Sequence, residues 1–153
     1  MKTIFRTILA AIVISLSLIS CTSSDSATTP PPAAGGSTGF SWRENDPAST
    51  TIQTAASASF STQYKTLIAK NAAGNTIFEI NLTGTAPATY NFGTGTGNAL
   101  RFIVPNPAFD ATSGKFIITA NASGKLSGTF EAFRSGTGIT RLYGIVTDIT
   151  VNP

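Results

Sequence analysis

Short segments in which apolar and polar residues alternate most limit what this chain can fold into. Four of them lie between turn signals rich in Gly, Asn, Ser and Pro: 76–82, 99–104, 115–120 and 125–133. In the second, Leu100, Phe102 and Val104 would share the face opposite Arg101. Such period-two alternation is typical of half-buried antiparallel strands, and residues 40–153 show no 3.6-residue apolar period. The sequence therefore predicts an all-β fold, either an antiparallel β-sandwich or a small barrel made of hairpins.

Three segments refine this prediction. Residues 115–133 form the clearest hairpin, with a turn over 121–124 where Asn and Gly tolerate positive φ. Residues 54–61 are rich in Ala and Ser and would suit a short helix, but we interpret them as a strand. The last segment, 139–151, is apolar on both faces, and we expect a central strand or one bent by a bulge at Gly144. Its two faces would carry Leu142, Gly144 and Val146, and Tyr143, Ile145, Ile149 and Val151.

The N-terminus has the organisation of a signal peptide. Lys2 and Arg6 precede an apolar run from Ile8 to Ile19 that only two serines interrupt. This run is shorter than the roughly 20 apolar residues that a bilayer span needs. A buried N-terminal helix is the alternative. We interpret residues 1–20 as a lipoprotein signal peptide.

The sequence Leu18-Ile19-Ser20-Cys21 looks like a bacterial lipobox. Cleavage between Ser20 and Cys21 would make Cys21 the first residue, and its acylation, with palmitate among the chains, would anchor the protein to a membrane. Several acyl chains hold a protein stably where one does so only marginally. Because Thr22 stands where an aspartate retains many lipoproteins at the inner membrane, we expect the cell envelope and the outer membrane, on its periplasmic or its surface face.

Residues 21–39 are interpreted as the lipidated cysteine followed by a disordered tether. Ser, Thr, Pro and Gly dominate residues 22–39, which have no apolar residue larger than alanine and cannot offset the entropy of ordering. Residues 40–153 then form a single β-domain, long enough for one core. Since Cys21 is the only cysteine, the domain has no internal disulfide.

The chain resembles small uncharacterised β-rich lipoproteins of Bacteroidota that share a domain of unknown function. The resemblance is carried by Phe40-Ser41-Trp42, by 77–93, by 113–130 and by 143–146, with Ala88 where such sequences often have Gly. It implies a β-rich fold and an envelope location, and no activity. Asp25-Ser26-Ala27 is similar to the short motif at which Bacteroidota attach O-glycans, which would make Ser26 an acceptor; a solvated tether is the alternative reading.

The sequence lacks the residue types that most catalytic mechanisms need. There is no histidine, and the one cysteine is the proposed anchor, so Ser-His-Asp triads, cysteine nucleophiles and His/Cys zinc sites are excluded. Glu44 and Asp46 beside Pro47 read as turn residues, although a facing pair such as Glu79 and Glu131 remains open. Gly93 to Asn98 lacks the lysine of a phosphate loop and reads as a hairpin loop. We expect no enzyme, no cofactor and no metal.

Aromatic residues are the better lead to a ligand site. Most should be core residues, but Phe109 lies in a loop beside two prolines, and Phe133 falls on the polar face of its strand. We therefore select Phe109 and Phe133 as ligand-contact candidates.

These observations lead to a functional hypothesis. We expect a lipid-anchored envelope β-domain that presents a binding surface to a glycan or an envelope protein. The alternative is a structural subunit of an envelope complex that pairs through its edge strands. A carboxylate-dependent enzyme is a third reading. Loss of Lys2 and Arg6 lowers the net charge from +3 to +1, and the other basic residues are scattered along the sequence, so we expect no nucleic-acid partner.

Overall fold

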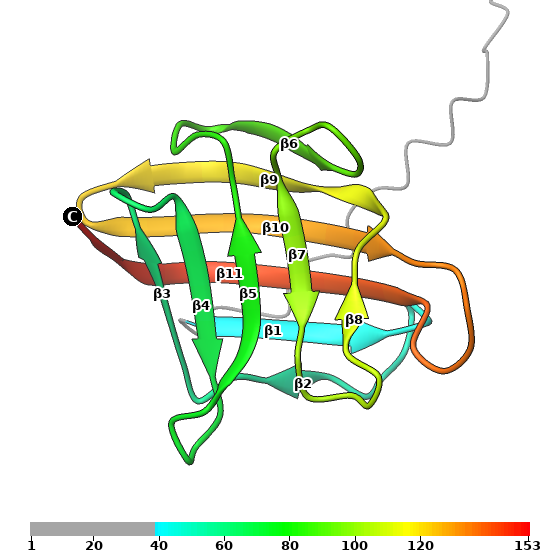
Figure 1. Cartoon of the computed structure of the whole chain (residues 1–153). Helices are drawn as coiled ribbons and strands as arrows, with labels where there is room; N and C mark the ends of the chain where they lie inside the picture. The colour runs from blue at the N-terminus through cyan, green and yellow to red at the C-terminus, as the bar shows by residue number, and fades with distance from the viewer. Residues whose placement is uncertain (1–38) are drawn as a thin grey trace, which may run out of the picture.

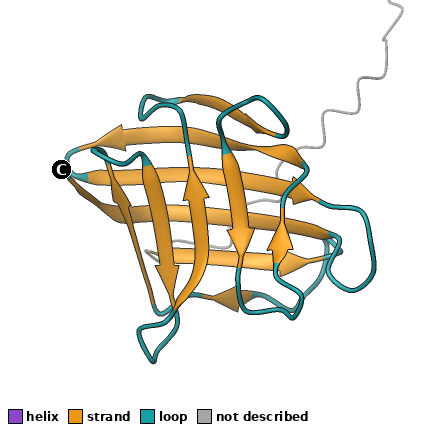
Figure 2. Cartoon of the chain, viewed as in Figure 1, coloured by secondary structure: helices purple, strands orange, loops and turns teal. Residues whose placement is uncertain are grey.

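A computed structural model describes residues 39–153, which form eleven strands joined by turns and loops (Figure 2). Within these residues there is no helix long and apolar enough to cross a membrane. The proposed signal peptide, Cys21 and nearly all of the proposed tether lie outside the described residues.

The strands form one continuous sheet that curls until its two halves face each other (Figure 1). The front half contains β3 (Ser57–Ser61), β4 (Thr66–Lys70), β5 (Thr76–Asn81), β7 (Ala99–Phe102) and β8 (Phe109–Asp110). The back half contains β6 (Ala88–Phe92), β9 (Ser113–Ala122), β10 (Lys125–Phe133), β11 (Arg141–Asn152), β1 (Gly39–Glu44) and β2 (Gln53–Thr54). Strands of the two halves cross at a steep angle, which makes a half-barrel and confirms the all-β prediction (Figure 1).

Two connections join the halves at one side. The chain bends from β2 into β3 at Ala55-Ala56, where Ala55 N–H donates to the Phe40 carbonyl and Ala56 N–H donates to that of Lys70, each at 2.9 Å. The end of β11 also pairs with β3, with Val151 opposite Phe60, and this pairing is parallel. All other strand pairs within residues 39–153 are antiparallel. The region 54–61 thus contains the end of β2, a bend at residues 55–56 and all of β3, so it is strand on both sides of the bend and has no helix.

Aromatic rings fill the space between the halves. Phe78 of β5 stacks on Phe102 of β7 with centroids 4.4 Å apart, and it lies 4.9 Å from both Phe40 and Trp42 of β1. Phe130 of β10 continues the cluster, with its centroid 5.4 Å from that of Phe40. Each buried ring of this kind contributes about 1.5–3 kcal/mol by leaving water. A domain without an internal disulfide is held together by this packing.

The β9–β10 hairpin forms as predicted, with a tighter turn. Ala122 pairs with Lys125, so only Ser123 and Gly124 connect the strands. Both have positive φ, 53° and 72°, as a type I′ turn requires.

Strand β11 is central, since it pairs with β10, β1 and β3. The alternative, a bulge at Gly144, is wrong, because Gly144 lies in regular register between Phe130 and Trp42. The bulge is at Asp148, whose φ is 49° and whose strand has an extra residue opposite Ser127. The Ser127 hydroxyl stabilises it: the hydroxyl donates to the Asp148 carboxylate at 2.9 Å and accepts from the Asp148 N–H at 3.0 Å.

Because of this bulge, the expected faces of β11 are wrong beyond Asp148. An extra residue shifts every later side chain to the other face of the sheet. Ile149 therefore packs in the core beside Leu142 and Val146 instead of sharing the outward face of Tyr143.

The expected inward position of Val104 is also wrong. Strand β7 ends at Phe102, and the Val104 side chain lies in the following loop with 61% of its surface exposed. Pro105 and Pro107 have no backbone N–H to donate to a sheet ladder. The strand therefore ends at Phe102, although the apolar alternation of the sequence continues to Val104.

Candidate functional site

The structure separates the two aromatic candidates. Phe109 begins the short strand β8, and its side chain has 0% of its surface exposed. It therefore presents no surface to a ligand here, and core packing accounts for it. Phe133 is half-buried at the end of β10, and it lies on the outward face as the alternation predicts. Ser20, Cys21 and Ser26 lie outside the described residues.

Arg134 explains why Phe109 is enclosed. Its guanidinium lies 5.2 Å from the Phe109 ring centroid. The same group donates to the carbonyl oxygens of Ala108 at 2.6 Å and Ile139 at 2.8 Å. Arg134 thus closes the loop after β10 over the edge of the core.

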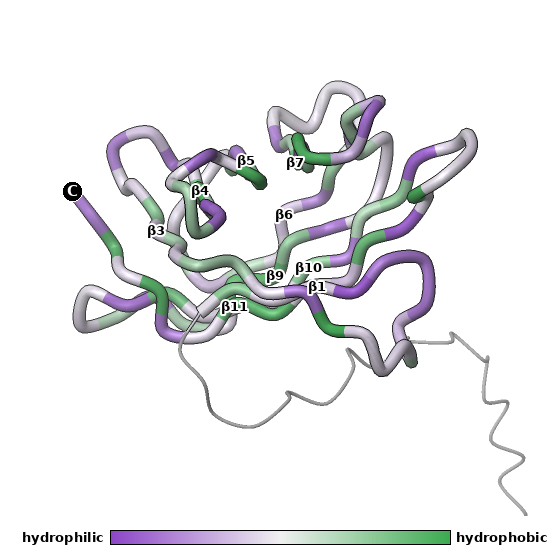
Figure 3. The backbone as a smooth tube through the Cα atoms, turned by 90° about the horizontal axis from the view of Figure 1, so that it is seen from below, coloured by the Kyte–Doolittle hydropathy of each residue, from purple (hydrophilic) through white to green (hydrophobic). Residues whose placement is uncertain are grey.

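The outward surface of the back half carries a second cluster that joins cations and aromatic rings. We call it the basic face and define it as Arg43, Lys115, Glu131, Phe133, Arg141 and Tyr143. No described strand covers this side of the back half (Figure 3). Three cations against one carboxylate give the basic face a charge of +2.

Its residues are neighbours in the strand register, and some of their side chains are in contact. Tyr143 lies between Arg43 and Glu131 in the strand register, and Phe133 lies opposite Arg141. The Phe133 and Tyr143 rings meet edge to face, with centroids 6.2 Å apart, and the Arg141 guanidinium lies 5.7 Å from the Phe133 centroid.

The charged members of the basic face are solvent-accessible to different degrees. The Lys115 ammonium contacts the Glu131 carboxylate at 3.0 Å, and the two side chains are 40% and 23% exposed. Tyr143 is only 6% exposed although it points away from the core. Lys115 is therefore more accessible to a ligand than the Tyr143 ring.

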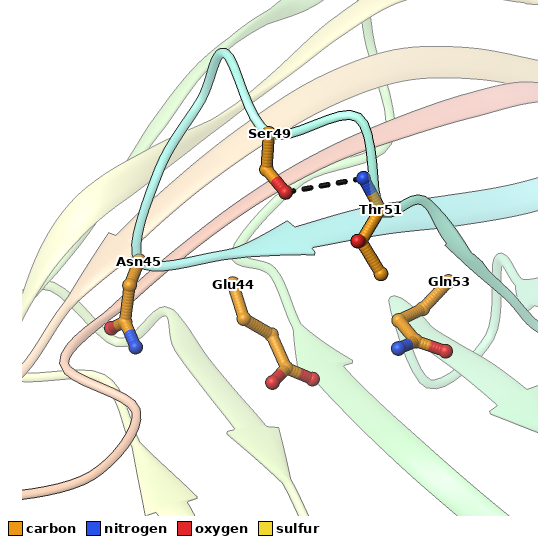
Figure 4. A pocket seen from close by; sticks show the side chains of 5 residues that line it. All are labelled: Glu44, Asn45, Ser49, Thr51 and Gln53. Carbon is orange, nitrogen blue, oxygen red and sulfur yellow. Dashed lines mark hydrogen bonds between the residues drawn. The ribbon is translucent and has the colours of Figure 1, made fainter.

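A second candidate is a small polar pocket at the rim of the half-barrel, which we call the rim pocket. It has a volume of about 250 Å³ and is lined by Glu44, Asn45, Ser49, Thr51 and Gln53 (Figure 4). Glu44 follows Phe40 and Trp42 at two-residue spacing along β1, so it lies on the same inner face of the sheet. Gln53 lies directly opposite Trp42. Both side chains thus lie on the inner face of the sheet, just beyond the last buried residue of the core at this rim.

The loop that covers the rim pocket, residues 45–52, is fixed by hydrogen bonds. Asn45 accepts at its side-chain oxygen from the Thr140 N–H at 2.8 Å, and the Arg43 Nε–H donates to the Ser49 carbonyl at 2.8 Å. The Thr51 N–H donates to the Ser49 hydroxyl at 3.2 Å (Figure 4). The Glu44 carboxylate accepts from the Trp42 indole N–H at 3.2 Å, which ties the pocket to the aromatic core.

The pair Glu79 and Glu131 does not face across a common cleft. Glu79 lies on the outward face of the front half, beside Arg101, whereas Glu131 lies on the basic face of the back half. Residues 39–153 also contain no group of three His, Cys, Asp or Glu side chains that could hold a metal ion.

Sequence reasoning did not select Glu44, Arg141 or Tyr143 as site residues. Glu44 was read as part of a turn, although its even spacing from Phe40 and Trp42 signals the inward phase. Arg141 and Tyr143 meet Phe133 only through strand pairing across the loop of residues 134–140, and nothing local in the sequence shows that pairing.

Comparison of the chain with protein-family models, with curated proteins and with solved structures finds no match.

Proposed function

We propose that the chain is a lipid-anchored domain of the cell envelope that binds an acidic glycan through its basic face. The anchor part of the proposal is supported by the lipobox-like sequence ending at Cys21. The binding part is supported by one observation above all: a patch of charge +2 around an aromatic pair that no described strand covers.

Some side chains beside the basic face suit a glycan. The next outward row of the back half alternates the hydroxyl side chains of Thr89, Thr129 and Ser41 with the half-buried Ile117 and Ile145. Hydroxyls hydrogen-bond to sugar hydroxyls, while Arg and Lys pair with carboxylate or phosphate. A protein interface usually centres on a well-exposed apolar or aromatic anchor. Here Tyr143, with 6% of its surface exposed, offers little such area.

The sheet edges give less support to partner pairing through edge strands. Strands β2 and β8 are two residues long each. Strand β6 is longer, but the Asn98 side-chain amide donates to its Asn91 carbonyl at 3.0 Å and so occupies one of its backbone acceptors. Short or blocked edges are how natural sheets avoid adding another strand.

A binding experiment with paired variants tests the proposal. The full chain, purified in detergent, is titrated with polygalacturonate and with neutral dextran. We expect the double variant Lys115→Ala/Arg141→Ala to lose at least about tenfold in affinity for polygalacturonate, because two charge-assisted contacts each contribute on the order of 1 kcal/mol. Added salt should weaken the binding of the unchanged chain.

Arg101→Ala is the matched control. Arg101 forms an exposed ion pair with Asp110 at 3.4 Å on the outward face of the front half. Its removal takes away the same type of charge from the other side of the molecule and should leave binding unchanged. Equal affinity for dextran, or an equal loss in the Arg101 variant, would contradict the proposal. Recovery of a cross-linked protein on the basic face without any glycan binding would replace the glycan by a protein partner.

A further inference from the structure

We propose that the rim pocket binds a single amino-sugar residue, with its ammonium group against Glu44. Glu44 and Gln53 of this site stand on the inner side of the sheet, whereas Lys115 and Arg141 of the basic face lie on its outer side; only Arg43 of the basic face also bonds to the pocket loop. The inference goes beyond the proposed function and does not depend on it.

Several polar groups of the rim pocket have no partner within residues 39–153. The Thr51 hydroxyl and the Gln53 amide make no hydrogen bond to the described part of the chain. Glu44 uses one oxygen toward Trp42 and keeps the other free of described partners. Together they offer a carboxylate, a hydroxyl and an amide, which can both donate and accept. A ligand with several hydroxyls matches this set.

The charge of the rim pocket determines which polyhydroxylated ligand it favours. Glu44 is the one charged residue among the five that line the rim pocket. Its carboxylate attracts an ammonium group, tolerates a neutral sugar and repels an acidic one. The volume of about 250 Å³ is below the 300–1,000 Å³ of usual small-molecule sites, so one sugar ring is a better match than a chain.

The pocket wall is already in place before a ligand arrives. Asn45 and Arg43 hold the covering loop through bonds of 2.8 Å to Thr140 and Ser49. A preorganised wall lowers the ordering cost of binding. Because the pocket is open to solvent on one side, we expect millimolar rather than micromolar affinity.

Three monosaccharides that differ in charge test the inference: glucosamine, glucose and glucuronate. Saturation-transfer NMR with the full chain in detergent should rank them in that order. Glu44→Gln keeps an acceptor for Trp42 but removes the charge, and it should abolish the preference for glucosamine over glucose. Gln53→Ala should weaken glucosamine and glucose alike.

Glu79→Gln, which removes a carboxylate from the outward face of the front half, is the control and should change nothing. If glucuronate bound as tightly as glucosamine, the inference would be overturned. The absence of saturable binding at millimolar sugar in a folded chain would overturn it as well. A preference for glucosamine that survives Glu44→Gln would overturn it too. The basic-face variant Lys115→Ala/Arg141→Ala should leave glucosamine binding intact, so failure at one site is distinguishable from failure at the other.

Discussion

Gly144 is the residue whose substitution should reveal most directly how the core is built. It lies on the inner side of β11, directly opposite Phe130 in the sheet register. An added Cβ would overlap two atoms of the Phe130 ring and lie 2.7 Å from a third, whereas ordinary contacts begin at 3.4 Å. The ring would have to move by roughly an ångström, since overlap in a close-packed core cannot be absorbed locally.

The surroundings of Phe130 set the magnitude. Its ring is 4% exposed, and its centroid lies 5.4 Å from that of Phe40 and 5.9 Å from that of Phe78, so there is no free space to move into. Overpacking typically costs about 1–3 kcal/mol, and this site belongs at the upper end. Alanine also restricts the unfolded chain, which returns about 0.4–1 kcal/mol. Gly144→Ala should therefore destabilise the domain by about 2 kcal/mol.

Urea unfolding followed by Trp42 fluorescence measures this cost, because Trp42 is the only tryptophan and lies in the same aromatic cluster. In a thermal scan the loss corresponds to a Tm lowered by about 8 °C for a domain of this size. Phe130→Leu provides the test of cause. In that background the ring is gone, and Gly144→Ala should cost less than about 1 kcal/mol, a coupling that a double-mutant cycle detects. An equal cost in both backgrounds would refute the overlap argument.

Three further predictions concern other parts of the chain. Arg134→Ala should lower stability by about 1–2 kcal/mol in urea unfolding, because part-buried carbonyl groups lose a charged donor, and Arg134→Lys should not restore it; full rescue by lysine would show that charge alone matters. Ser123→Asn should raise stability by a few tenths of a kcal/mol to about 1 kcal/mol, since Asn suits positive φ in a type I′ turn, and a lower urea midpoint would contradict this. Cys21→Ser should move the protein out of the membrane fraction of cells with the β-domain still folded; retention in that fraction without cleavage would favour an ordinary helical anchor instead.

The fold class followed from local sequence, whereas the sheet closure did not. Alternation along residues 125–133 places Leu126 and Phe130 inside and Phe133 outside, because a period-two pattern determines the faces of any regular strand. The parallel pairing of Val151 with Phe60 depends on the path of the whole chain. No local pattern encodes it.

Irregularities in the strands account for the errors in face assignment. The bulge at Asp148 reverses the faces beyond it, yet its signal is only a serine on another strand and a residue type that tolerates positive φ. Phe109 was misjudged for a related reason. Its flanking prolines indicated an exposed loop, whereas Arg134, far along the chain, closes over it. Contacts between distant segments decided both cases.

The rim pocket follows from the incomplete closure of the half-barrel. In a small closed barrel, side chains from neighbouring strands fill the interior. Strand β2 contributes only Gln53 and Thr54, so the inward row at the end of β1 has no further strand beside it. An apolar residue there would face water, and Glu44 instead bonds to the Trp42 indole while keeping one oxygen free of described partners. The same short strand therefore denies a partner a long edge and leaves a polar cavity at the rim. This links the weakness of the edge-pairing alternative to the presence of a candidate ligand site.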